Sequence, residues 1–234
     1  MLKVELHAHI KGDPSDRILH NAFQLIDRAA QLGYGALAIT LHNRWTDPAP
    51  LTEYAQARGV TMLSGIERNI GRKHLLLING PKEAERLQTF DDVMAFKAQT
   101  GALVVAPHPF YPIGSAVGHI LEERPNLADA IEINSMYARG IDFNQKALAW
   151  ARRNGKPLVG NTDLHLLMQL GTTYSLVDCD QGTPDAICNA IRAGRVQAVS
   201  RALSWPRAAF LFTGMVVGGL LPPGPQQAIH QAEP

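Results

Sequence analysis

Residues 4–13 read VELHAHIKGD, an apolar run that leads into two histidines, His7 and His9, one residue apart. In an extended strand, residues i and i+2 point to the same face, so this segment would hold two imidazoles side by side. Such a pair is a good ligand set for a divalent metal ion, although surface histidines are the commoner explanation of an isolated His-x-His. The rest of the sequence decides between these two interpretations.

Short apolar or β-branched runs alternate with segments of helical periodicity along most of the chain. Strands are expected at 4–6, 35–40, 60–67, 74–78, 101–106, 129–134, 156–161 and 172–177, and helices at 18–32, 50–58, 83–99, 115–124, 142–153 and 183–193. This repeated alternation predicts an α/β fold with a mainly parallel sheet, which is either open or closed into a barrel.

The end of the chain has a different composition. Residues 208–221 are apolar and rich in glycine, and residues 222–234 (PPGPQQAIHQAEP) are typical of a disordered tail. The apolar stretch is shorter than the roughly 20 residues that cross a bilayer. We therefore predict one domain over 1–203 and a terminal segment over 204–234, with a buried helix as the main interpretation of the apolar stretch and membrane contact as the lesser one.

Composition limits the class of protein. The chain has 234 residues, 46% of them hydrophobic and 18% charged, with a net charge of +1, as expected of a globular protein. The balanced charge makes nucleic acid an unlikely main partner. Only two cysteines are present, and no secretory signal is visible at the N-terminus. These features predict a cytoplasmic protein with no transmembrane span and with reduced cysteines.

Metal-binding residue types recur at the ends of the predicted strands. In chain order they are His7 and His9, His42, Glu67, His108, and finally Asp163 with His165. The carboxyl ends of parallel strands lie on one face of an α/β fold, so these side chains should meet there. His74 is the exception, because it begins its strand instead of ending it. The set exceeds four ligands, which predicts more than one metal ion.

Single residues of this kind have plainer explanations. Asp13 precedes a proline and could cap a helix, and His108, between two prolines, could be a rigid loop residue. His20 and His119 are best explained as helix or surface residues, and His230 belongs to the tail. The recurrence of ligand types at successive strand ends is what favours a metal site.

The motifs HAH (7–9), ITLHN (39–43), GIE (65–67), APHPF (106–110) and NTDLH (161–165) resemble, in order and spacing, those of the polymerase and histidinol phosphatase (PHP) superfamily. The resemblance extends from residue 2 to about residue 200. It implies a distorted (β/α)7 TIM-like barrel whose rim holds two or three ions of Mn, Fe or Zn, and an activity that hydrolyses phosphate esters.

The resemblance also implies a role for each ligand. One ion would be held by His7, His9, Glu67 and Asp163, and a second by Glu67, His74 and His108, with Glu67 bridging the two. A third would be held by His42 and His165 with an acidic residue, for which Asp13 is the first candidate and Asp16 the second. Relatives often read SDG where this chain reads GDPSD, and commonly have aspartate where it has Leu41, so both departures concern the third ion.

The implied reaction is in-line attack on phosphorus by a hydroxide that bridges two metal ions. Glu67, His108 and Asp163 are the expected catalytic residues, and Arg44 and Arg139 are candidates for binding the phosphate. The expected substrate is a small phosphorylated molecule, either a phosphomonoester or a nucleotide. Its identity is not readable from the sequence.

Three alternatives remain open. An amidohydrolase-type barrel also begins with His-x-His, but it would need a lysine at a mid-barrel strand end, which residues 65–70, 101–110 and 129–134 do not supply. A catalytically weakened PHP module would keep metal for a structural or regulatory role. A PHP domain that serves a polymerase is disfavoured by the balanced charge and by the absence of polymerase sequence.

Overall fold

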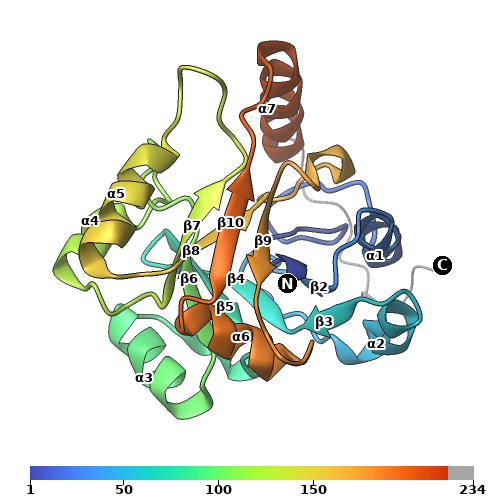
Figure 1. Ribbon diagram of the computed structural model, residues 1–234. Coiled ribbons are helices and arrows are strands. Elements are labelled where there is room, and N and C mark those ends of the chain that lie inside the picture. Colours follow the sequence, from blue (N-terminus) through green and yellow to red (C-terminus); the bar gives the residue numbers. More distant parts are fainter. Residues whose placement is uncertain (221–234) are drawn as a thin grey trace.

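The computed structural model describes residues 1–220, whose ten strands form two five-stranded sheets (Figure 1). The first sheet has the order β10-β9-β1-β2-β3, from β1 (Leu2–Glu5), β2 (Ala36–Ala38), β3 (Thr61–Leu63), β9 (Thr173–Val177) and β10 (Val196–Ser200). The second runs in chain order through β4 (Gly65–Ile70), β5 (Lys73–Ile78), β6 (Leu103–Ala106), β7 (Ala130–Asn134) and β8 (Leu158–Asn161).

Helices cover the outside of the sheets (Figure 1). They are α1 (Ala22–Gln31), α2 (Ala49–Gln56), α3 (Phe90–Thr100), α4 (Gly118–Glu123), α5 (Asn144–Asn154), α6 (Pro184–Arg192) and α7 (Trp205–Leu220), with 3-10 helices at Lys82–Arg86 and Leu167–Gln169. The α/β class predicted from the sequence is confirmed.

Strand direction differs from the expectation of a mainly parallel sheet. β1, β2 and β3 pair in parallel, as do β6, β7 and β8, but β4–β5, β5–β6, β1–β9 and β9–β10 are antiparallel. Within residues 1–220 the strand pairing between the two sheets is limited to isolated bridges, among them Ala8–Leu164 and His42–Glu67. A barrel closed by continuous strand pairing, as the predicted (β/α)7 architecture requires, is therefore not confirmed.

Several element boundaries differ from the sequence expectation for local reasons. The first helix begins at Ala22 and not at residue 18, because the Asn21 side chain caps it in a capping box with Gln24. The single strand expected at 60–67 divides at Ser64, whose hydroxyl donates to the carbonyl of Gly80 as the chain passes from one sheet to the other. The antiparallel strand β10 was not predicted.

Helix α7 begins with exposed apolar side chains, and the predicted buried stretch, residues 208–221, is exposed at Phe210 but buried at Leu211. Trp205 is 56% exposed and Phe210 is 61% exposed, whereas Leu211 is buried. Figure 1 shows α7 projecting beside the loop between β7 and α5, and Ala138 in that loop bridges to Leu203. No helix in residues 1–220 is long and apolar enough to cross a membrane. The predicted disordered tail, 222–234, lies outside the described residues.

Candidate metal centre

The ligand-type residues that follow the strands meet where the two sheets adjoin. His7 and His9 lie just after β1, His42 after β2, His108 after β6, and Asp163 and His165 after β8, while Glu67 lies within β4. His74 joins them because β5 runs antiparallel to β4, so that the beginning of β5 reaches the same end of the sheet. All but two of the predicted ligands thus come from the loops after strands: Glu67 lies inside β4, and strand direction explains His74.

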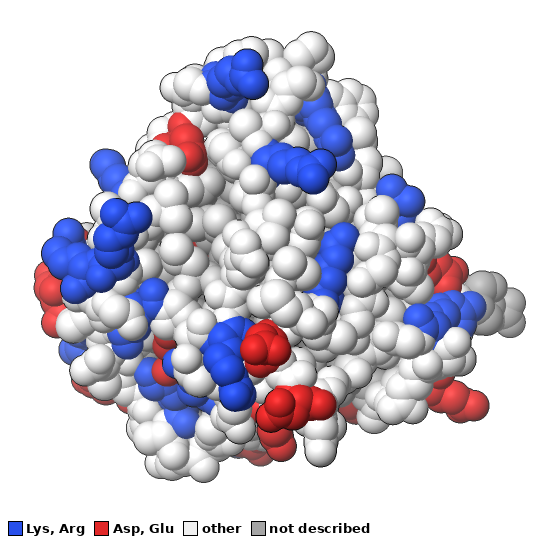
Figure 2. Space-filling view, in the orientation of Figure 1, with Lys and Arg blue, Asp and Glu red and all other residues white. Residues whose placement is uncertain are grey.

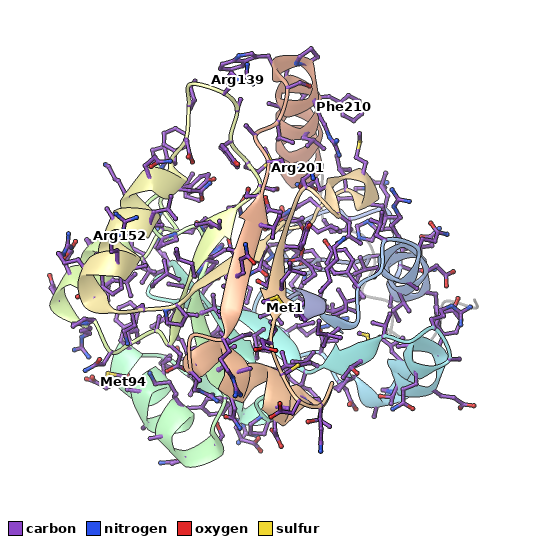
Figure 3. All side chains as sticks on the ribbon, viewed as in Figure 1. Met1, Met94, Arg139, Arg152, Arg201 and Phe210 are labelled. Carbon is purple, nitrogen blue, oxygen red and sulfur yellow. The ribbon has the colours of Figure 1, made fainter. Side chains whose placement is uncertain are left out.

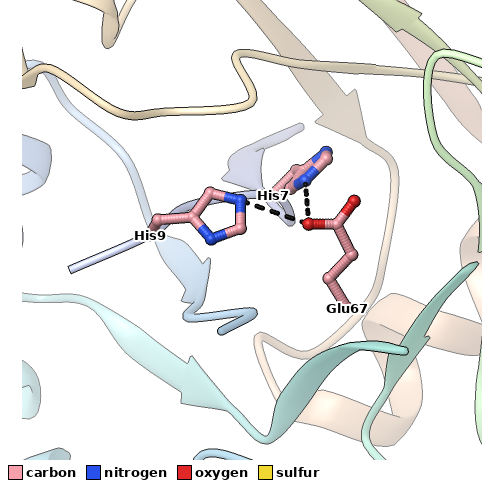
Figure 4. A group of neighbouring side chains, drawn as sticks. All are labelled: His7, His9 and Glu67. Atoms are coloured by element: carbon pink, nitrogen blue, oxygen red, sulfur yellow. Dashed lines mark ion pairs between the residues drawn. The ribbon is translucent and has the colours of Figure 1, made fainter. Parts of the chain in front are cut away.

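Glu67 is the centre of the cluster. It is 1% exposed, and its Oε2 lies 3.4 Å from Nε2 of His7, 3.4 Å from Nε2 of His9 and 3.1 Å from Nε2 of His42. Figure 4 shows the first two imidazoles directed at this one oxygen. One carboxylate oxygen therefore faces the ring nitrogens of three histidines.

The other oxygen of Glu67 faces a different pair of histidines. Oε1 lies 2.6 Å from Nδ1 of His74 and 3.6 Å from Nε2 of His108. Asp163 adds a second carboxylate on the Oε2 side, where its Oδ1 is 3.3 Å from Nε2 of His7. The two oxygens of Glu67 thus divide the surrounding imidazoles into two sets.

Several atoms of this cluster are buried without a hydrogen-bond partner. They are Nε2 of His7 and of His9, both carboxylate oxygens of Glu67, Nδ1 of His74 and Nδ1 of His108. Unpartnered buried polar atoms are costly, so a native protein rarely keeps so many in one place without a ligand. Imidazole nitrogen and carboxylate oxygen are ligands that suit Zn, Fe and Mn, so this donor set fits divalent metal ions.

The charge state of the carboxylates also suits a cation. Burial alone would raise the pKa of Glu67, but the surrounding histidines, His7 foremost, hold it well below its usual value. Burial would likewise raise the pKa of Asp163, but the histidines, His7 foremost, hold it well below its usual value. In return, burial would lower the pKa of His9, whereas the hydrogen bond from its Nδ1 to Asp13 and the nearby carboxylate of Asp163 raise it to about 10. A cation that binds here would displace these protons.

Asp13, the first candidate for the third ion, lies behind two imidazoles. Its carboxylate accepts hydrogen bonds from Nδ1 of His9 at 2.9 Å, and from Nδ1 and the backbone N–H of His42 at 3.0 Å each. Asp16, the second candidate, has Oδ2 at 3.2 Å from Nε2 of His165. Asp13 therefore orients rings that face Glu67, while Asp16 faces the histidine expected at the third ion.

The departure at Leu41 is explained by packing. Leu41 is fully buried in the hydrophobic cluster that includes Ile39 and Leu51. An aspartate at this position is not needed to orient His42, because Asp13 already accepts from its ring and backbone.

The two arginines predicted to bind phosphate lie in different surroundings. Arg44 is partly buried and donates to the carbonyl of Gly12 at 3.1 Å, in the loop that carries Asp13. Arg139 is exposed, and Figure 3 places it at the outer tip of the loop between β7 and α5, beside α7. Among the described residues it forms no ion pair with the cluster, so the structure does not bring Arg139 to the predicted site.

Two of the clustered residues have unusual backbones. His108 has φ of 32° and Asp163 has φ of 51°, in the left-handed region that non-glycine residues seldom adopt. Such conformations cost on the order of 1–3 kcal/mol each and persist where the surroundings enforce them, commonly at functional sites. Here they lie in the turns that follow β6 and β8 and present the side chains of His108 and Asp163 to the cluster.

Sequence analysis missed Glu132, a buried acidic residue within β7. Its Oε2 accepts a hydrogen bond from Nδ1 of His7 at 2.9 Å. The available signal was a charged residue inside the apolar strand run DAIEIN, since a buried carboxylate needs partners.

Comparison with known proteins finds similarity in one segment of the sequence and in the fold. A family model described as PHP-associated matches residues 142–196, and no curated protein matches the sequence. The fold is shared with a two-domain protein from Bacteroides vulgatus ATCC 8482 that contains a predicted PHP-like metal-dependent phosphoesterase, at 19% identity and a TM-score of 0.66. That match covers 86% of this chain but only 65% of the other protein.

Two further structures share the fold. PsfC from Pseudomonas syringae PB-5123 has 18% identity and a TM-score of 0.67, and the match covers 93% of this chain and 97% of PsfC. The lesion-specific endonuclease PfuEndoQ from Pyrococcus furiosus has 15% identity and a TM-score of 0.57, with 84% of this chain and 57% of that one covered. The PHP-associated match and the shared fold together support the membership of this chain in the PHP superfamily.

Proposed function

We propose that this protein is a metal-dependent phosphoesterase that hydrolyses small phosphorylated molecules. The observation that supports this function best is that the two carboxylate oxygens of Glu67 face different histidines. Oε2 faces His7 and His9, whereas Oε1 faces His74 and His108. A carboxylate with a separate set of imidazoles at each oxygen suits a bridge between two cations.

The proposal assigns the ligands of each ion. His7, His9, Glu67 and Asp163 would hold the first ion, Glu67, His74 and His108 the second, and His42 and His165 with Asp16 or Asp13 the third. Mn, Fe or Zn ions bound there would neutralise phosphoryl oxygens, lower the pKa of water and stabilise the leaving oxygen. In-line attack of hydroxide on phosphorus is part of this proposal, as is a barrel-like arrangement of the two sheets.

The chain's own residues would prepare the site for this chemistry. Asp13 holds the rings of His9 and His42 so that each Nε2 faces Glu67. Arg44 is the remaining candidate for contacting a substrate phosphate, because its guanidinium lies at the loop that carries Asp13. An amidohydrolase-type reaction is a weaker candidate, since no lysine lies among the described side chains around Glu67.

The size of the substrate is a separate part of the proposal. The face in Figure 2 carries basic and acidic side chains separated by wide uncharged areas, with no continuous basic surface. This face therefore offers no extended basic track for a nucleic-acid backbone. The fold shared with a lesion-specific endonuclease nevertheless leaves the prediction that nucleic acid is an unlikely main partner without support. The cytoplasmic location also stays a prediction.

The test begins with elemental analysis of the purified protein, followed by reconstitution with Mn, Fe or Zn. The reconstituted protein is then assayed on small phosphomonoesters, on nucleotides and on lesion-containing DNA. We expect more than one ion per chain and metal-dependent release of phosphate from small substrates. Protein that binds no metal after reconstitution, or that cleaves amides and not phosphate esters, would refute the proposal. Preference for DNA would correct the substrate class alone.

A further inference from the structure

Glu132 is a completely buried glutamate within β7, and both of its oxygens are fully engaged. Oε2 accepts from Nδ1 of His7 at 2.9 Å and from Nδ2 of Asn161 at 3.0 Å. Oε1 accepts from the backbone N–H of His108 at 3.1 Å and from Nδ2 of Asn134 at 3.1 Å. A carboxylate with two donors at each oxygen has no free position to bind an ion itself.

The contact with His7 fixes which ring nitrogen faces the centre. A carboxylate oxygen engaged in this way only accepts, so Nδ1 of His7 must carry the hydrogen. The neutral ring then presents the lone pair of Nε2, which lies 3.4 Å from Oε2 of Glu67 and has no hydrogen-bond partner. Glu132 thus selects the form of His7 that can bind a metal ion.

The contact with His108 acts on the backbone. His108 has φ of 32°, and its N–H donates to Glu132 in this uncommon conformation. The turn places Nε2 of His108 at 3.6 Å from Oε1 of Glu67, which is the oxygen that His7 does not face. Glu132 therefore supports one ligand on each side of Glu67.

We infer that Glu132 is a positioning residue that couples the two ion positions, since it orients His7 of the first and holds the backbone turn of His108 of the second. This inference rests on the proposed function and deepens it. Asp13 provides the contrast, because its ring contacts are with His9 and His42, both on the Oε2 side of Glu67. Loss of Glu132 should weaken the binding of both ions, whereas loss of Asp13 should leave the ion at His74 and His108 bound.

The experiment compares Glu132→Gln with Asp129→Asn. Asp129 lies immediately before the same strand, at the end away from the cluster. Its carboxylate accepts hydrogen bonds from the backbone N–H of Val104 and from Nζ of Lys97. In Glu132→Gln, an amide NH₂ replaces one oxygen and faces two donors. Calorimetric titration with Mn²⁺ or Zn²⁺ should then show both ions bound about 10–100-fold more weakly than in wild type. Asp129→Asn should bind both ions as wild type does.

Two further readouts separate positioning from loss of folding. Thermal unfolding of the metal-free variants shows whether Glu132→Gln is folded, and excess metal should restore much of its rate of phosphate ester hydrolysis. Should that variant not fold, nitrogen NMR of the His7 ring in the zinc-loaded wild type is the alternative. The ring should be protonated at Nδ1 and bound through Nε2.

The outcomes distinguish the inference from the proposed function. Equal metal affinity in wild type and Glu132→Gln, weakening of one ion only, or a His7 ring protonated at Nε2 would overturn the role of Glu132 and leave the phosphoesterase intact. Wild-type protein that binds no ion would overturn the proposed function and the inference together.

Discussion

Glu67 and Glu132 are both glutamates of the second sheet, and both are almost fully buried, yet their surroundings are opposite. Neither oxygen of Glu67 has a hydrogen bond, although five imidazoles surround it. Both oxygens of Glu132 are saturated by four donors. Burial therefore does not distinguish a ligand from its support. Under the proposed function, the unpartnered carboxylate is the one available to a cation, and the satisfied one holds the surrounding side chains in place.

The largest expected effect comes from substitution of Glu67, the glutamate without hydrogen bonds. Glu67→Gln should lower the rate of phosphate ester hydrolysis by roughly 1,000-fold, because an amide cannot bridge two cations. This loss exceeds the 10–100-fold typical of residues that only hydrogen-bond to a metal ligand. The measurement is kcat/KM at saturating metal. His119→Ala, an exposed residue, is the control and should retain full activity. Similar losses in the two variants would mean that the metal ligands are misassigned.

A packing residue beside the cluster provides the second prediction. Leu41→Asp should destabilise the fold by about 2–4 kcal/mol, because it buries a charge among Ile39 and Leu51 without a partner. Denaturant unfolding measures the loss, and activity against metal concentration is recorded in parallel. A lower metal requirement in a stable variant would show instead that position 41 supports His42.

Removal of metal tests the unpartnered atoms directly. A metal ion whose free concentration is 100 times its dissociation constant stabilises the folded state by about 2.7 kcal/mol. Removal of the metal with a chelator should therefore lower the unfolding temperature measurably. Glu67→Gln should respond much less to the same treatment. A wild-type unfolding temperature that is independent of metal would contradict the assignment of these atoms as ligands.

The smallest effect concerns His20, which belongs to the satisfied framework and donates through Nε2 to the carbonyl of His9 at 2.8 Å. Burial lowers the pKa of His20 from 6.5 to about 4, so the unfolded chain binds the proton more readily. Its contribution to stability should therefore be complete above pH 6.5 and decline as the pH falls towards 4.

His20→Gln keeps a donor at this position without a titrating group. The free energy of unfolding of wild type, measured from pH 4 to 7, should fall relative to that of the variant progressively as the pH drops from 6.5 towards 4. Parallel curves for the two proteins would show that His20 does not stay neutral in the fold.

The sequence alone was sufficient to identify most of the side chains that meet in this cluster. His7, His9, His42, His108 and Asp163 follow strands whose apolar runs are visible locally, and strand ends gather on one face of an α/β fold. Short stretches of sequence carry this information, because a strand and the turn after it are local structures. The α/β class follows from the same alternation.

Only the tertiary structure decided how these residues are arranged and supported. His74 reaches the centre because β5 is antiparallel to β4, and Glu132 contacts His7 across 125 positions of the chain. Asp13 proved to hold two rings, and Arg139 lies away from the cluster. Strand direction and hydrogen-bond partners of buried groups depend on pairing between distant segments. Local periodicity therefore reveals which residues reach the cluster, but not which carboxylate is left unpartnered there and which one holds the rings around it.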